Sequence, residues 1–90
     1  LKHFEEARPL LEKVITREPN KIDALFHLGI IYSALSQENE AAKSYLRVIQ
    51  INPKHGEAHH NLATVYLRQN QPQLALEHFK EAVHILPQNS

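Results

Sequence analysis

Three histidines crowded into six residues are the part of this 90-residue chain best suited to chemistry. His55 and His59 have the i, i+4 spacing that can place two imidazoles on one face of a helix, and His60 follows directly. Imidazole is a frequent zinc ligand, but all three rings would have to converge. We expect His59 to point inward, His60 to point outward and His55 to lie at the start of the helix. Because convergence would need backbone adjustment, and no cysteine or HExxH motif is present, we predict no metal site and no cofactor.

Enzymatic chemistry has little support elsewhere in the chain. No nucleophile and base occur at a recognisable spacing, there is no glycine-rich phosphate loop, and the chain has only two glycines. The serines, which are best interpreted as surface or turn residues, are Ser33, Ser36, Ser44 and Ser90. We therefore predict that the chain is not an enzyme.

The charge balance excludes two further classes of partner. Ten basic residues offset ten acidic ones, so the concentrated basic surface that nucleic acid or an anionic membrane requires is missing. No apolar run approaches the roughly 18 residues of a membrane span, and no signal-peptide pattern opens the chain. We expect a soluble chain without nucleic-acid partners or membrane insertion, for which the cytoplasm is slightly favoured and the compartment is otherwise open.

A 34-residue period organises the whole sequence. Pro19, Pro53 and Pro87 stand 34 residues apart, and apolar residues recur in step with them. A repeated unit of this length is typical of a solenoid, in which each unit buries its apolar face against its neighbours. The aligned apolar slots are Ala7, Ala41 and Ala75; Leu11, Tyr45 and Phe79; Val14, Val48 and Ala82; and Ile15, Ile49 and Val83.

Apolar residues at three- and four-residue steps predict five amphipathic helices. One complete unit contains a helix over 21–35 and a second that ends near Pro53, and the next contains helices over 56–69 and 73–86. Their inward faces include Ala58, Leu62 and Tyr66, then Phe79 and Val83.

The first helix, over 1–18, has no partner within its own unit. Pro9 lies about one turn into it, so we expect it to start late or to bend, with fraying before Arg8.

These motifs resemble the tetratricopeptide repeat, or TPR. The pattern Leu25-x-x-Leu28-Gly29-x-x-Tyr32, followed by Ala41-x-x-x-Tyr45 and Pro53, matches the family signature, and Leu62-Ala63-x-x-Tyr66, Ala75-x-x-x-Phe79 and Pro87 match it again. The resemblance implies an all-α, right-handed α-solenoid of antiparallel helix pairs. Residues 1–20 would form a half repeat, and residues 21–55 and 56–90 would form two whole repeats, together one domain of about two and a half repeats.

The resemblance also implies that the first helices of the repeats line a concave groove that binds a peptide or a partner protein. Small residues should let the paired helices approach closely, while the polar and apolar residues outside the core stripe face the groove. The predicted binding residues are Asp23, Phe26, His27 and Ile30 on one helix, and Glu57, His60, Asn61, Thr64, Leu67 and Arg68 on the next.

Some TPR proteins clamp a C-terminal carboxylate on this face. Here only Asn61 and Arg68 could contribute, and Asp23 and Glu57 would repel an acidic tail, so we do not expect that mode. His27 and His60 could instead face each other and make the groove sensitive to pH.

A structural module is the alternative function. The first helix lacks its partner, and the last one, with Leu76, Val83 and Leu86, has no polar capping helix after it, so either end could stack on another copy to form a homo-oligomer. The sequence begins within a repeat and without an initial methionine, which suggests that it is a slice of a longer protein. That protein could be an enzyme that uses this segment as its docking arm.

Overall fold

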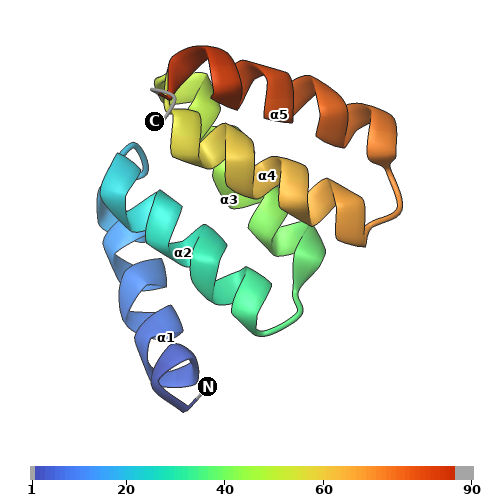
Figure 1. Cartoon of the computed structure of the whole chain (residues 1–90). Coiled ribbons are helices and arrows are strands. Elements are labelled where there is room, and N and C mark those ends of the chain that lie inside the picture. Colours follow the sequence, from blue (N-terminus) through green and yellow to red (C-terminus); the bar gives the residue numbers. More distant parts are fainter. Residues whose placement is uncertain (1, 87–90) are drawn as a thin grey trace.

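The computed structural model describes residues 2–86, which contain helices joined by short connections (Figure 1). Leu1 and residues 87–90, which include Pro87 and Ser90, lie outside the described residues. Every predicted helix is present, and apart from the start of the first one the helix ends lie within two residues of those expected. The helices are α1 (Lys2–Arg17), α2 (Ile22–Ala34), α3 (Glu38–Ile51), α4 (Gly56–Arg68) and α5 (Pro72–Ile85).

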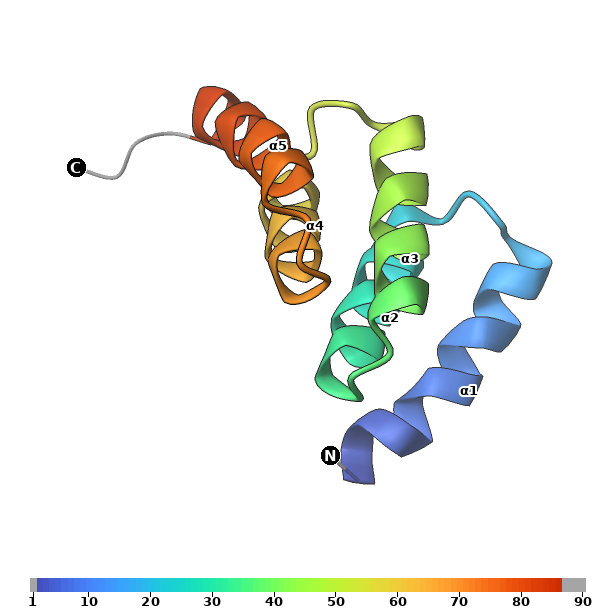
Figure 2. The same cartoon turned by 90° about the vertical axis from the view of Figure 1, so that its right-hand side faces the viewer.

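The helices stack in chain order as an α-solenoid. Helices α2 and α3 form one antiparallel pair and α4 and α5 form the next, while α1 packs on α2 and α3 packs on α4 (Figures 1 and 2). The parallel helices α2 and α4 also contact each other directly. This arrangement confirms the predicted fold class and brings the first helices of the two complete repeats side by side.

Each first helix ends in the same backbone motif, which turns the chain into the second helix. Ser36 and Asn70 stand 34 residues apart, and both adopt the left-handed conformation, with φ of 63° and 62°. Behind Ser36, the Gln37 amide donates to the Tyr32 carbonyl at 2.8 Å and the Ser36 amide donates to the Ser33 carbonyl at 3.0 Å. These paired bonds satisfy carbonyls that the helix leaves free, so the period extends to the geometry of the turn.

The core lies where the helix pairs meet, and its tightest contact joins α2 to α3. Ala41, Val48 and Leu62 are fully buried there, as their slots in the repeat predict. Gly29 lies against the ring of Tyr45, which is only 2% exposed. A methyl group added at Gly29 would sit 2.5 Å from Cε1 of that ring, well inside contact distance. Glycine therefore lets the two helices approach around the tyrosine.

The first helix departs from its predicted start. Helix α1 begins at Lys2 and runs through Pro9, so the expected late start and fraying before Arg8 are wrong. Pro9 removes one backbone hydrogen bond, but it lies on the exposed side of the helix, which continues on both sides of it. Arg8 pairs with Glu5 at 3.9 Å and with Glu12 at 4.0 Å, which links the turns on either side of the proline.

The inward position predicted for Val83 is also wrong. Val83 is 60% exposed, whereas its equivalent Ile49 is partly buried against the core. Helix α4 packs on α3, but no described helix packs on the equivalent face of α5. Burial at this slot therefore depends on the helix that follows it in the stack.

The Gly29 contact makes a stability prediction. Gly29→Ala should lower the free energy of unfolding by about 1–3 kcal/mol through overpacking, even though alanine favours helices by about 1 kcal/mol. Urea denaturation measures the change. In a double-mutant cycle, the penalty should shrink when Tyr45→Leu removes the ring, and a penalty that is unchanged would show that the ring is not its cause.

Candidate functional site

A groove of about 470 Å³ lies between α2 and α4, with Tyr45 of α3 between them. Its walls come from parallel helices, so residues one turn apart on each helix follow its length. Five of the predicted binding residues line it, together with three that were not on that list. The lining residues are Ile30, Ser33, Ala34, Tyr45, His60, Asn61, Thr64 and Arg68.

Tyr45 joins the core to the groove. Its ring is buried against Gly29, and its hydroxyl accepts a hydrogen bond from the Asn61 side-chain amide at 3.4 Å. Burial raises the pKa of Tyr45 to about 12, so the hydroxyl keeps its proton at neutral pH. Because that hydroxyl receives the Asn61 bond, its own hydrogen can be donated to a ligand in the groove.

Asn61 offers further hydrogen-bonding capacity beside Tyr45. An amide side chain has two donors and one carbonyl acceptor, and only one donor is directed to the tyrosine. Its oxygen lies 3.4 Å from Nδ1 of His60, which is at the long end for a hydrogen bond. The side chain can therefore exchange this weak contact for a bond to a ligand.

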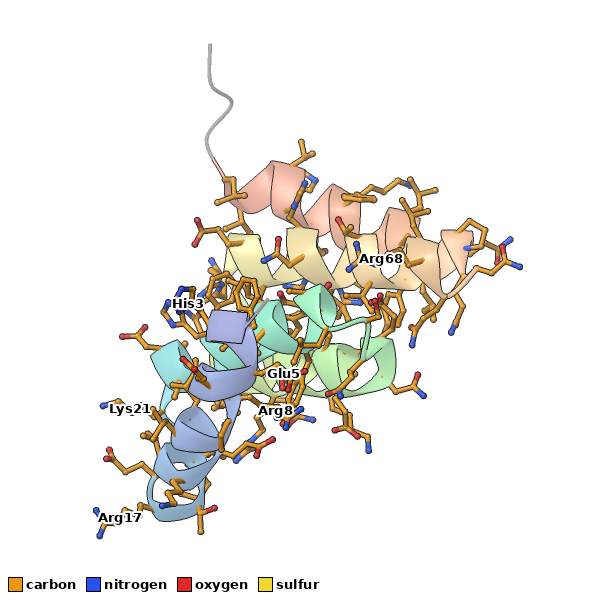
Figure 3. All side chains as sticks on the ribbon, turned by 90° about the horizontal axis from the view of Figure 1, so that it is seen from below. His3, Glu5, Arg8, Arg17, Lys21 and Arg68 are labelled. Atoms are coloured by element: carbon orange, nitrogen blue, oxygen red, sulfur yellow. The ribbon has the colours of Figure 1, made fainter. Side chains whose placement is uncertain are left out.

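Among the described residues that line the groove, Arg68 is the only arginine, lysine, aspartate or glutamate, and it is already paired. Its Nε donates to Oε2 of Glu38 at 3.0 Å, and its Nη2 donates to Oγ of Ser33. Figure 3 shows Arg68 on α4, far from Arg17 and Lys21, which lie near the α1–α2 connection. One residue further along, Gln69 donates to Asn39 at 2.7 Å, so the end of α4 is fastened to the start of α3 twice.

The remaining predicted binding residues lie outside this groove. Phe26 is half-buried, with its ring centroid 5.8 Å from Tyr45 and 4.9 Å from His55, so it packs on the core rather than lining the groove. His27 donates through Nδ1 to the Asp23 carbonyl at 2.7 Å. The ring of His60 packs against that of Phe79, with a centroid separation of 5.4 Å. The other exposed members of the set are Asp23, Glu57 and Leu67.

Sequence reasoning left Tyr45 and Glu38 out of the site. Tyr45 occupies a core slot of the repeat. Only Gly29, the small residue opposite it, indicated that the ring could extend past the core. Glu38 fell in the predicted connection, but it is the first residue of α3, where acidic side chains are common. Its partner is 30 residues away, so no local pattern joins the two.

A second polar cluster lies behind the groove, where His59 and His78 meet. His59 is buried, as predicted, and its Nε2 lies 2.9 Å from the Pro53 carbonyl, which can only accept a hydrogen bond. Neutral His59 therefore carries its hydrogen on Nε2 and accepts through Nδ1. The Nδ1 of His78, at 2.9 Å, must then be the donor. Burial and the neighbouring His59 lower the pKa of His78, although Glu77 and Glu81 oppose the shift.

The described residues hold neither a cluster of metal ligands nor a membrane-spanning helix. Among residues 2–86, no group of three or more histidine, cysteine, aspartate or glutamate side chains is arranged to hold a metal ion. Within the same residues, no helix is both long enough and apolar enough to cross a membrane.

Comparison with known proteins identifies the repeat. Two tetratricopeptide repeat family models match residues 22–55 and 44–77, which together span more than half of the chain. The chain belongs to the tetratricopeptide repeat family. TPR units form scaffolds for protein–protein interaction, and this family and fold are typical of non-catalytic proteins. That the chain is not an enzyme stays a prediction.

Relatives of this TPR chain are much longer proteins. Tetratricopeptide repeat-containing protein trd-1 of Caenorhabditis elegans is 30% identical over 91% of the chain, and anaphase-promoting complex subunit CDC16 of Saccharomyces cerevisiae is 26% identical over 99%. The chain spans 11% of the length of each. Their activities and partners are therefore not transferred to it.

Solved TPR structures reproduce the helix arrangement. Two structures of MamA AMB-1 superpose with TM-scores of 0.90 and 0.91 at 30% and 29% identity. They cover 93% and 99% of this chain, which spans 49% of each MamA chain. The stacking of α1 to α5 is therefore also seen in experimental structures.

The histidine pair predicts a loss of stability in mild acid. Because folding lowers the pKa of His78, the unfolded chain takes up the proton at higher pH than the folded chain does. The free energy of unfolding should therefore fall as the pH drops below about 6.5, the ordinary histidine value. Urea denaturation at pH 7.5 and pH 5.5 measures the loss, which His78→Gln should reduce.

The matched control for this change is His84→Gln, which replaces an exposed histidine on the same helix. In this variant the free energy of unfolding should fall between pH 7.5 and pH 5.5 by the same amount as in the wild type. An equal loss in wild-type protein and in His78→Gln would contradict the assignment.

Proposed function

We propose that this TPR chain is a protein-interaction module whose α2–α4 groove binds an extended peptide segment of a partner protein. The observation that carries the proposal is the groove itself, in which an apolar wall faces polar side chains with hydrogen-bonding capacity to spare. Ile30 and Ala34 supply the apolar surface, and Asn61 and Thr64 stand opposite them on α4. This combination suits a peptide, which presents both side chains and backbone amides.

The shape of the groove favours an extended ligand over a compact one. Its walls come from two parallel helices, and it is open rather than enclosed. Asn61 can bond a peptide backbone through both donor and acceptor, while the Tyr45 hydroxyl at the floor adds another donor. Because Tyr45 is held by the core, its hydroxyl is positioned before the ligand arrives, which reduces the entropy lost on binding.

Self-association is a second candidate function, favoured by the outer face of α5. Leu76 and Val83 are 54% and 60% exposed, and with Phe79 they line an apolar hollow of about 340 Å³. The 34-residue equivalents Ala42 and Tyr45 are buried on α3, which α4 covers. A second copy could cover the α5 face, and sedimentation over a concentration series would detect the dimer.

Peptide selection followed by substitution tests the groove. Peptides selected from a displayed random library on the wild-type chain should lose about tenfold in affinity, or about 1.4 kcal/mol, with Asn61→Ala. The expected cause is the loss of hydrogen bonds to the peptide backbone. Fluorescence anisotropy of the labelled peptides measures the dissociation constants.

Lys43→Ala is the control for this experiment, since Lys43 is exposed on α3 and does not line the groove. It should leave the affinity unchanged. Failure to select any binder, or binders that tolerate Asn61→Ala, would exclude the groove as the binding site.

A further inference from the structure

We propose that Glu38 sets the charge specificity of the groove by neutralising Arg68, so that the ligand is an extended peptide with no carboxylate where it crosses Arg68. This inference rests on the proposed function of the groove. It adds a specificity-determining residue outside the groove lining and names the chemical class of the peptide.

Arg68 is already occupied by partners within the chain. A guanidinium that lines a peptide groove would ordinarily attract an acidic side chain or a terminal carboxylate. Here its Nε is bonded to Glu38 at 3.0 Å, and its Nη2 is bonded to Ser33. Side-chain exposure is 45% for Arg68 and 23% for Glu38, so the carboxylate is the more buried partner. An acidic ligand would have to compete with an anion that is already in place.

Glu38 in turn depends on Arg68 for its hydrogen bonding. Its Oε1 is buried and has no hydrogen-bond donor within the described part of the chain. The carboxylate therefore relies on the bond that Oε2 accepts from Arg68. If a ligand carboxylate drew Arg68 away, both oxygens of Glu38 would be left short of donors in a mostly buried position. Displacement is therefore unfavourable, and Arg68 stays committed to Glu38.

Two acidic residues lie beyond the groove lining, at the other end of its two helices. Helices α2 and α4 run parallel, so the acidic residues in their first turns, Asp23 and Glu57, lie together at the end opposite Arg68. Both are exposed. With Arg68 neutralised inside the groove and two carboxylates beyond its opposite end, the field along the groove disfavours acidic peptides and accepts uncharged or basic ones.

Matched peptides test the assignment. A peptide selected on the wild-type chain is synthesised in pairs that differ by single Gln-to-Glu exchanges along its length, and each dissociation constant is measured by fluorescence anisotropy. Wild type should bind the uncharged member at least about tenfold more tightly at one or more positions. In Glu38→Gln, which keeps the side-chain shape but frees the charge of Arg68, that preference should disappear or reverse.

Glu40→Gln is the matched control, because it removes the same charge from an exposed residue of the same helix that does not line the groove. It should retain the wild-type preference. Arg68→Gln should strengthen the preference for the uncharged peptide, which gives a second readout if thermal melting shows that Glu38→Gln is unfolded.

Two results would overturn the inference about Glu38. They are a wild type that binds both members equally and a Glu38→Gln variant that keeps the wild-type preference. Either result would leave the groove intact as a peptide site. If no selected peptide depends on Asn61, the proposed function fails instead, and the charge specificity fails with it.

Discussion

The packing of Tyr45 against Gly29 is the contact on which both the stack and the groove depend. A residue without a side chain on α2 lets the ring of α3 fill the space between the paired helices, and that ring is almost fully buried. Its far end carries a hydroxyl that reaches Asn61 on α4. One side chain therefore sets the spacing of one repeat and forms the floor of the groove shared with the next.

The polar contacts around the groove follow from this spacing. Once α3 lies against α2 and α4, the start of α3 meets the end of α4, and Glu38 comes within 3.0 Å of Arg68. The pair fastens the two repeats together and also removes a positive charge from the groove. Stability and specificity thus share the same ion pair, and its partial burial gives it more effect than an exposed pair would have.

Much of the fold could be predicted from the sequence because the period appears in residues with clear local consequences. Prolines mark the ends of the second helices, and small residues mark close approaches, so the helix bounds were placed within two residues except at the start of α1. Ile30 and Asn61 were assigned to the groove from their helix faces together with the resemblance to the TPR family. The roles of Tyr45 and Glu38 could not be predicted in this way, because long side chains reach across helix junctions. Val83 was misplaced because its burial depends on a neighbouring helix and not on its own periodicity.

A peptide-binding groove between α2 and α4 is the central claim, and amide chemical-shift mapping tests it most directly. Titration of ¹⁵N-labelled protein with a selected peptide should perturb residues of the groove, above all Ile30, Ser33, Asn61 and Arg68, while the outer face of α5 stays unchanged. Perturbations that centre on Leu76 and Val83 and leave the groove unaffected would contradict the account and assign binding to the exposed end of the stack.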